Sequence, residues 1–166
     1  MPRLRLAIEQ IAFARGYTVR LLEQTKLEDW FRQPPGGVTH IAWQVGHLAI
    51  AEYRLTLMRT RGPRPDDNEL VSPQFLGLFG ATSVPDADTV KYPSQTAILA
   101  VLDRVHEQTL RELPGLTEHE LDQPPLQPHP IARTKLWSLL WCAQHEMVHA
   151  GQIGLLRRQL GYAPLW

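Results

Sequence analysis

The sequence predicts an all-α protein, a four-helix bundle with long crossover connections. Three observations lead to this fold class. Apolar residues recur at helical spacing over four long segments of the chain. Proline- and glycine-rich stretches separate these segments, and almost nothing between them alternates as a β-strand does. Four long helices without strands are typical of a bundle, in which each helix buries an apolar face against its neighbours.

The first two long helices are expected in the N-terminal part of the chain. Apolar residues at helical spacing predict the first helix over residues 3–24, and the breaker "QPPGG" follows at residues 33–37. Thr39 is the expected cap of a second helix, "HIAWQVGHLAIAEYRLTLMRTRG", which ends near Gly62. A short helix with Ser72 as its cap is expected before the third long helix.

The third and fourth long helices are expected in the C-terminal half. Pro93 opens the third, and "PG" at residues 114–115 ends it. The fourth begins near Thr134 and runs to Gln159, with Gly161 as its stop. The connections before these two helices span about 30 and about 20 residues, longer than compact bundles usually need. We therefore expect each long connection to cross over the bundle or to carry function.

Length and composition exclude several classes of protein. With 166 residues, we expect residues 1–166 to form a single domain. Basic and acidic residues number 17 each, a balance that favours neither nucleic acid nor an anionic membrane as a partner. No apolar run is long enough to span a bilayer, and the N-terminus lacks a signal-peptide core. A single cysteine, which cannot form an internal disulfide, suits a cytoplasmic location.

The segment "HEMVH", from His145 to His149, has the H-E-x-x-H form found in zinc peptidases. Two histidines four residues apart lie on one helix face and can bind one metal ion. The peptidase interpretation needs a third ligand downstream, but no His, Asp, Glu or Cys follows His149. The sequence therefore argues against a peptidase, and Glu146 is expected to be solvated or salt-bridged rather than a general base.

A third ligand must then come from upstream of the motif, and His47 is the best placed candidate. It lies in the middle of the apolar segment "WQVGHLAIAEY", where Gly46 would permit close approach of another backbone. A buried histidine here is either bonded to a carbonyl group or serves as the missing ligand. His40 is too far along the helix for the same ion and would line a pocket mouth or cap the helix. The remaining histidines lack such a context: His106, His119 and His129.

Three segments together resemble a known family. They are "PPGG", "IAWQVGHLAIAEY" at residues 41–53 and "HEMVHAGQIGLLRRQLG" at residues 145–161. In this order and spacing they resemble the DinB-like superfamily of four-helix metalloproteins, which includes YfiT-like and thiol-transferase branches. The resemblance covers most of the chain. It implies that His47, His145 and His149 bind one divalent metal ion, zinc or nickel.

The residues around the implied site suggest the form of a pocket. Trp43 and Trp141 each lie one helical turn before a histidine and are expected to wall the site through core packing. Gln152, one turn after His149, would form a polar rim. Cys142 is either a fourth ligand or a small buried residue, and we expect the second.

The resemblance also implies a class of function. Three histidines leave a coordination position open on a divalent ion. The leading hypothesis is a metal-dependent S-transferase that joins a low-molecular-weight thiol, such as bacillithiol or mycothiol, to a small-molecule substrate in stress or detoxification. The alternatives are a metal-assisted hydrolase of a small substrate and a non-enzymatic metal-binding stress protein. The family often forms dimers, and the last helix has nearly two apolar faces, so a homodimer is expected.

Overall fold

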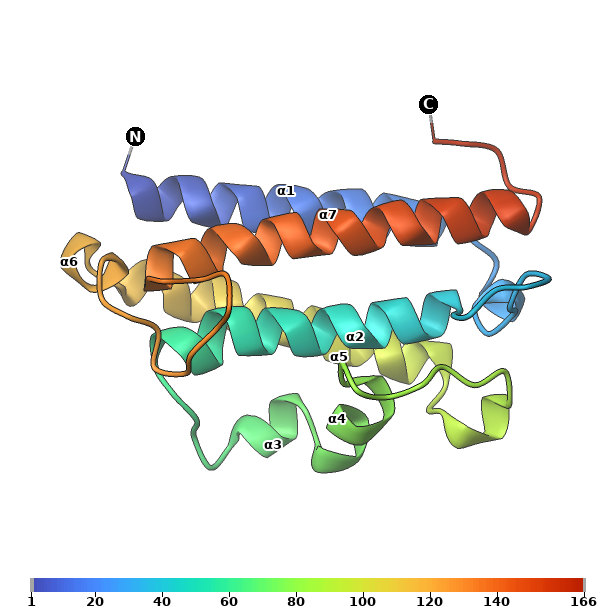
Figure 1. Ribbon diagram of the computed structural model, residues 1–166, viewed down its shortest axis with the longest axis horizontal. Helices are drawn as coiled ribbons and strands as arrows, with labels where there is room; N and C mark the ends of the chain where they lie inside the picture. Colours follow the sequence, from blue (N-terminus) through green and yellow to red (C-terminus); the bar gives the residue numbers. More distant parts are fainter. Residues whose placement is uncertain (1, 166) are drawn as a thin grey trace.

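The computed structural model describes residues 2–165 and contains four long helices (Figure 1). They are α1 (Arg3–Glu23), α2 (Ile41–Tyr53), α5 (Gln95–Glu112) and α7 (Lys135–Gln159). The described part of the chain contains no β-strand, which confirms the all-α prediction. Each helix in it is too short or too polar to cross a bilayer.

The four long helices form two parallel pairs. α1 packs along α7, α2 packs along α5, and α2 also contacts α7. In Figure 1, α1 and α7 run in one direction while α2 and α5 run in the other. This up-down-down-up order requires one connection to return along the whole bundle.

Of the two long connections, the one between α2 and α5 crosses the length of the bundle (Figure 1). It carries α3 (Asp67–Leu70), α4 (Pro73–Phe79) and the 3₁₀ turn η3 (Thr89–Lys91). The connection between α5 and α7 stays at one end and carries η4 (Leu113–Gly115) and α6 (Glu118–Leu121). Another 3₁₀ turn, η1, lies between α1 and α2 at Leu27–Asp29.

Two helices start where the sequence predicts, at Ser72 and near Thr134. The Thr134 hydroxyl accepts the Trp137 amide at the start of α7, and Ser72 accepts the Phe75 amide at the start of α4. These bonds satisfy amide groups that have no partner within the helix itself. The predicted starts of α4 and α7 are therefore confirmed.

Two helix starts differ from the prediction. Ser94, one residue beyond Pro93, caps α5 because its hydroxyl accepts the amide of Ala97. His40, rather than Thr39, caps α2, since its Nδ1 accepts the amide of Trp43. The expectation for Thr39 was thus wrong, whereas capping by His40 was one of its two expected roles.

The second long helix is not uniformly α-helical. It continues from α2 into a π-helical segment, η2 (Arg54–Met58). The Thr56 hydroxyl donates to the Glu52 carbonyl at 2.6 Å, and the Ser138 hydroxyl of α7 donates to the Leu55 carbonyl at 2.6 Å. Side chains thus satisfy carbonyl groups in a turn whose backbone ladder is irregular.

The apolar core has two parts. The larger lies among α2, α4, α5 and the C-terminal halves of α1 and α7. The smaller lies between the N-terminal halves of α1 and α7, beside α6. Along α1, the buried Arg15 separates Ala14 of the smaller part from Leu21 of the larger. A layer of buried charge therefore lies between the two apolar parts.

Candidate metal centre

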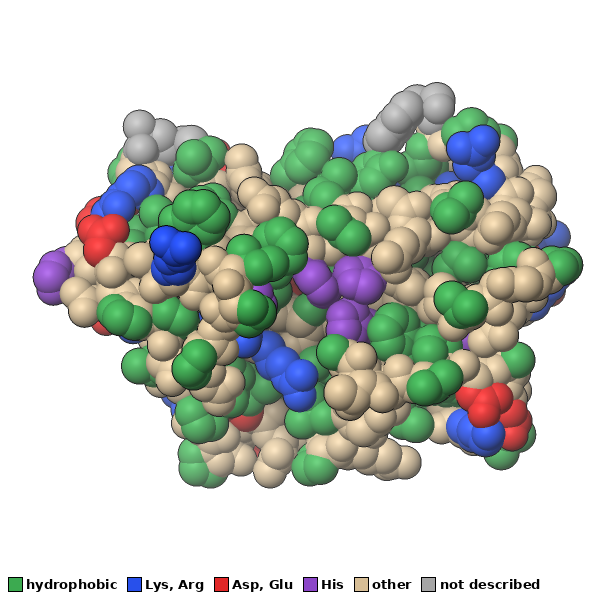
Figure 2. All heavy atoms as spheres, viewed as in Figure 1, with side chains coloured by type: hydrophobic (Ala, Val, Ile, Leu, Met, Phe, Trp, Pro, Cys, Tyr) green, Lys and Arg blue, Asp and Glu red, His purple; other side chains and the backbone are tan. Residues whose placement is uncertain are grey.

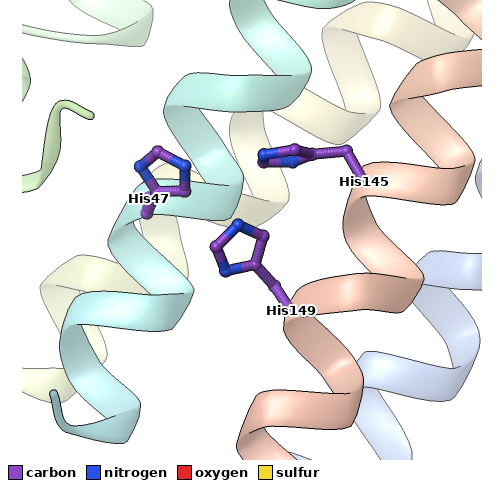
Figure 3. Close-up of side chains that lie close together, drawn as sticks. All are labelled: His47, His145 and His149. Atoms are coloured by element: carbon purple, nitrogen blue, oxygen red, sulfur yellow. The ribbon is translucent and has the colours of Figure 1, made fainter. Parts of the chain in front are cut away.

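The three predicted ligand histidines meet between two helices (Figure 3). His47 projects from α2, and His145 and His149 project from α7. One ring nitrogen from each lies within 4.8 Å of the others. The ring centroids are 4.5–5.4 Å apart. The fold thus brings together residues separated by about a hundred positions in the chain.

His47 is held by two contacts that set its ring orientation. Its Nδ1–H donates to the Phe79 carbonyl at 2.9 Å, which leaves the Nε2 lone pair free. The Trp43 ring stacks on the imidazole with centroids 4.8 Å apart and planes 7° apart. A Cβ atom on Gly46 would lie 2.4 Å from the Phe79 ring, so glycine is needed there. The close neighbour of Gly46 is therefore an aromatic ring, whereas the sequence suggested a backbone.

His149 is oriented by a short relay of hydrogen bonds. Its Nδ1–H donates to the Oε1 atom of Gln44 at 2.5 Å. The Gln44 amide in turn donates to the Thr39 hydroxyl at 3.0 Å, which fixes the direction of that amide. His149 thus presents Nε2, and partners of this kind are usual behind metal-binding imidazoles.

His145 provides the observation that tests whether a metal ion fits. Its Nδ1 is buried and has no hydrogen-bond partner within residues 2–165. A buried polar nitrogen without a partner is costly, and most such atoms in native proteins are satisfied. Together with the free Nε2 atoms of His47 and His149, this ring gives a set of three imidazoles suited to a divalent ion.

The electrostatics of the cluster keep the imidazoles neutral. Burial, and then the neighbouring imidazoles, lower the pKa of His145 to about 4 and that of His149 to about 3. Burial and the nearby Arg54 also lower the pKa of His47. At neutral pH the rings therefore carry lone pairs rather than protons, as metal binding requires.

A family model described as the DinB superfamily matches residues 10–153. This span covers most of the chain and includes His47, His145 and His149. The chain belongs to the DinB superfamily. A search of curated proteins finds no match.

Glu146 has a different role in this DinB-superfamily protein from the one it would have in a peptidase. Its side chain accepts from Arg15 at 2.7 Å, and the residue is only 2% exposed. The salt-bridged alternative is therefore confirmed, and the solvated one is wrong. A carboxylate held by a buried guanidinium is not available as a general base.

Cys142 is not part of the histidine cluster. It packs in the smaller apolar part of the core, and burial raises the pKa of its thiol well above the ordinary value. A metal-binding cysteine needs a thiolate, which this environment disfavours. The expectation of a small buried residue is confirmed.

The other histidines serve different purposes. His40 caps α2, His106 lies 2.8 Å from the Glu52 carboxylate, and His119 is exposed. His129, in the loop before α7, lies close enough to His145 to help lower its pKa. Sequence reasoning found no context for His129, because only the folded loop brings it to the centre.

Two residues that orient the histidine rings were not predicted from the sequence. Gln44 lies three positions before His47, a helical spacing that was a usable signal for a residue on the same side. Phe79, the last residue of α4, acts through its backbone carbonyl. The type of its side chain therefore gives no indication of this role. Of the residues expected to form the pocket, Trp43 contacts His47 as predicted. The ring centroid of Trp141 lies 6.3 Å from that of His145, and the side chain of Gln152 is exposed.

Proposed function

We propose that the protein is a metal-dependent S-transferase that joins a low-molecular-weight thiol to an electrophilic small molecule in stress or detoxification. His47, His145 and His149 would bind a single zinc or nickel ion. The observation that supports this best is the convergence of three neutral imidazoles without a carboxylate in the group. Such ligands leave the double positive charge of an ion uncompensated and a position open for an anionic thiolate.

When bound, the ion would lower the pKa of a coordinated thiol, which is ordinarily about 8.5. In the overall reaction, the thiol proton passes to water and the sulfur lone pair forms a bond to the electrophilic carbon. The leaving group departs with its bonding pair. The protein contributes orientation: the Phe79 carbonyl and the Gln44 amide hold two imidazoles, and Trp43 covers one face of His47.

We also propose that the protein acts as a homodimer through the exposed side of α1 and α7. A groove of about 680 Å³ lies between these helices and has a mainly apolar lining that includes Leu6, Phe13, Met147 and Val148. The side chains are prominent, since Phe13 is 67% exposed and Val148 55% exposed. Contiguous apolar surface of this kind is usually covered by a partner, and a two-fold axis would let each copy cover the other.

The transferase proposal is tested by thiol consumption with a model electrophile. We expect the zinc- or nickel-loaded protein to accelerate the reaction, and the metal-free protein and His47→Ala to return it to background. His119→Ala, at an exposed histidine, is the matched control and should retain the wild-type rate. A rate independent of metal would contradict the proposal. Metal-dependent ester cleavage without thiol would favour the hydrolase, and bound metal with neither activity would favour the non-enzymatic alternative.

A further inference from the structure

We propose that the ligand of the histidine centre carries a carboxylate group, which Arg54, Arg59 and His129 bind. This inference rests on the proposed function, because it concerns the substrate of the same site. It arises from three hydrogen-bond donors that lie beside the centre and have no acidic partner among residues 2–165. Figure 2 shows basic side chains (blue) next to the group of histidines (purple) in the hollow on this face.

Arg54 shares a helix face with His47. The two residues are seven positions apart, which is nearly two full turns and about 10 Å along the axis. Helical side chains lean toward the N-terminus, so the Arg54 guanidinium reaches back toward His47. Its charge contributes, after burial, to the lowered pKa of His47. Arg54 is exposed and forms no ion pair with any described residue.

Arg59 follows the π-helical segment and is folded back over it. Its Nη1 donates to the Arg54 carbonyl at 2.9 Å. Its Nε is buried and unbonded among residues 2–165, and it lies on the same edge of the guanidinium as Nη2. Burial and the like charge of Arg54 lower the Arg59 pKa, with no carboxylate to compensate. A free guanidinium edge matches the two oxygens of a carboxylate.

His129 supplies the third donor. The loop that carries it is tied to Arg59, whose carbonyl accepts the Leu126 amide at 3.0 Å. The His129 Nδ1 accepts the amides of residues 131–132, so the neutral ring has its proton on Nε2. His129 contributes to the lowered pKa of His145, and Arg59 to that of His129. The loop, held by the Leu126–Arg59 hydrogen bond, thus brings the His129 ring near both Arg59 and His145.

This group differs from the arginines that are satisfied within the fold. Arg15 pairs with Glu52 and Glu146, and Arg61 pairs with Asp67 and Glu112. The buried Arg157 has no ion pair with any described residue, but its Nε donates to the Thr25 hydroxyl at 2.9 Å. Cations that are unpaired beside neutral imidazoles create a positive potential that selects an anion. A small molecule with one end at the imidazoles and a carboxylate at the arginines fits this arrangement.

The experiment compares two thiols on cobalt-loaded protein, followed by the thiolate-to-cobalt absorption band. We expect mercaptosuccinate to bind wild type at least about tenfold more tightly than neutral 2-mercaptoethanol. Arg54→Gln and Arg59→Gln should remove this preference, because they weaken binding of mercaptosuccinate by a far larger factor than binding of 2-mercaptoethanol, which has no carboxylate. Arg20→Gln, at an exposed arginine of α1, removes the same charge elsewhere and should keep the preference.

Two outcomes overturn the carboxylate site while leaving the metal function intact. One is equal affinity of the two thiols for wild type, and the other is the same preference in Arg59→Gln as in Arg20→Gln. If wild type takes up no cobalt, the proposed function fails instead. Calorimetric titration of metal-free protein with succinate then decides the carboxylate site. Binding that is lost in Arg54→Gln supports it, and absence of binding to wild type overturns it.

Discussion

Gln44 and Phe79 determine which nitrogen two of the histidines present to the centre. Each accepts a hydrogen bond from an imidazole Nδ1–H and leaves Nε2 free. Without such a partner, a ring can rotate or change its tautomer and lose its alignment with the other two. The geometry of the histidine cluster therefore depends on residues that lie behind the imidazole rings.

We expect Gln44→Leu to weaken binding of a divalent ion by roughly 10- to 100-fold, because His149 loses its oriented acceptor. Competition with a chromophoric chelator measures the affinity. Gln152→Leu, at an exposed glutamine of α7, makes the same change away from these bonds and should have little effect. Equal affinities for the two variants would show that the relay is unimportant.

The histidine pKa values predict how the metal-free protein responds to acid. In the folded state the pKa is about 4 for His40 and His145 and about 3 for His149, against an ordinary value of 6.5. Between these values the unfolded chain binds protons that the folded protein does not. Stability should therefore be complete above pH 6.5 and fall as the pH drops toward 4.

Urea unfolding in the presence of a chelator, at pH 7.5 and at pH 5, checks this dependence. We expect a lower free energy of unfolding at pH 5. His40→Gln should reduce the difference, since one of the depressed pKa values is removed. A metal-free protein that is equally stable at both pH values would contradict the burial of neutral imidazoles.

The convergence of the three histidines could be predicted from the sequence, whereas the residues that orient them could not. His145 and His149 are four residues apart on one helix, so their spacing alone places them on the same helix face. His47 was the best placed upstream candidate because of its apolar helical context, and the resemblance implied the same residue. The partners Phe79 and His129 come from connections whose path depends on tertiary packing, for which spacing carries no information.

At the scale of elements, a buried charge network joins the long helices. Arg15 of α1 bonds Glu52 of α2 and Glu146 of α7 at 2.7 Å, and it donates to the Leu102 carbonyl of α5 at 3.0 Å. Burial opposes its charge, but the two carboxylates hold the pKa of Arg15 above the ordinary value. One side chain thus links all four helices of the bundle.

Arg15→Met should lower the free energy of unfolding by about 3–5 kcal/mol, because two buried carboxylates lose their partner. Urea denaturation measures the change. Arg20→Met, at an exposed arginine of the same helix, should change stability by no more than about 0.5 kcal/mol. A similar small effect at Arg15 would mean that the network contributes little.

The bounds of the helices could be predicted from local sequence, whereas the π-helical turn and the cap of α2 could not. The predicted first helix, residues 3–24, matches α1 to within one residue because caps and apolar spacing are local signals. The π-helical turn was not foreseen, since it depends on contacts such as that of Ser138 with the Leu55 carbonyl. The choice of His40 over Thr39 as cap also depends on side-chain bonds, because Thr39 accepts from Gln44 and His40 Nε2 donates to the Asp86 carbonyl of the long connection at 3.1 Å.

At the scale of the whole molecule, the fold class could be predicted from the sequence, whereas the pairing of the helices could not. Four amphipathic segments without strands have few compact arrangements, and the bundle is one of them. Which helices become neighbours is not encoded in their separate periodicities. The parallel pairs follow from the crossover that carries α3 and α4.

The proposed homodimer predicts a specific effect of charge on the α1–α7 groove. Phe13→Glu should convert a dimer into a monomer at micromolar concentration, because it introduces charge into the centre of an apolar surface. Size-exclusion chromatography with light scattering gives the mass. Val90→Glu, at a 90% exposed apolar residue outside the groove, should leave the dimer intact. A wild type that is strictly monomeric at high micromolar concentration would rule out this interface.

The metal content of the purified protein addresses the function of the centre itself. Elemental analysis should find roughly one divalent ion per chain in wild type and little in His145→Ala, which removes one of three converging imidazoles. His119→Ala, with the same substitution at an exposed site, should retain the wild-type content. Equal metal content in wild type and His145→Ala would contradict the assignment of His47, His145 and His149 as a metal centre.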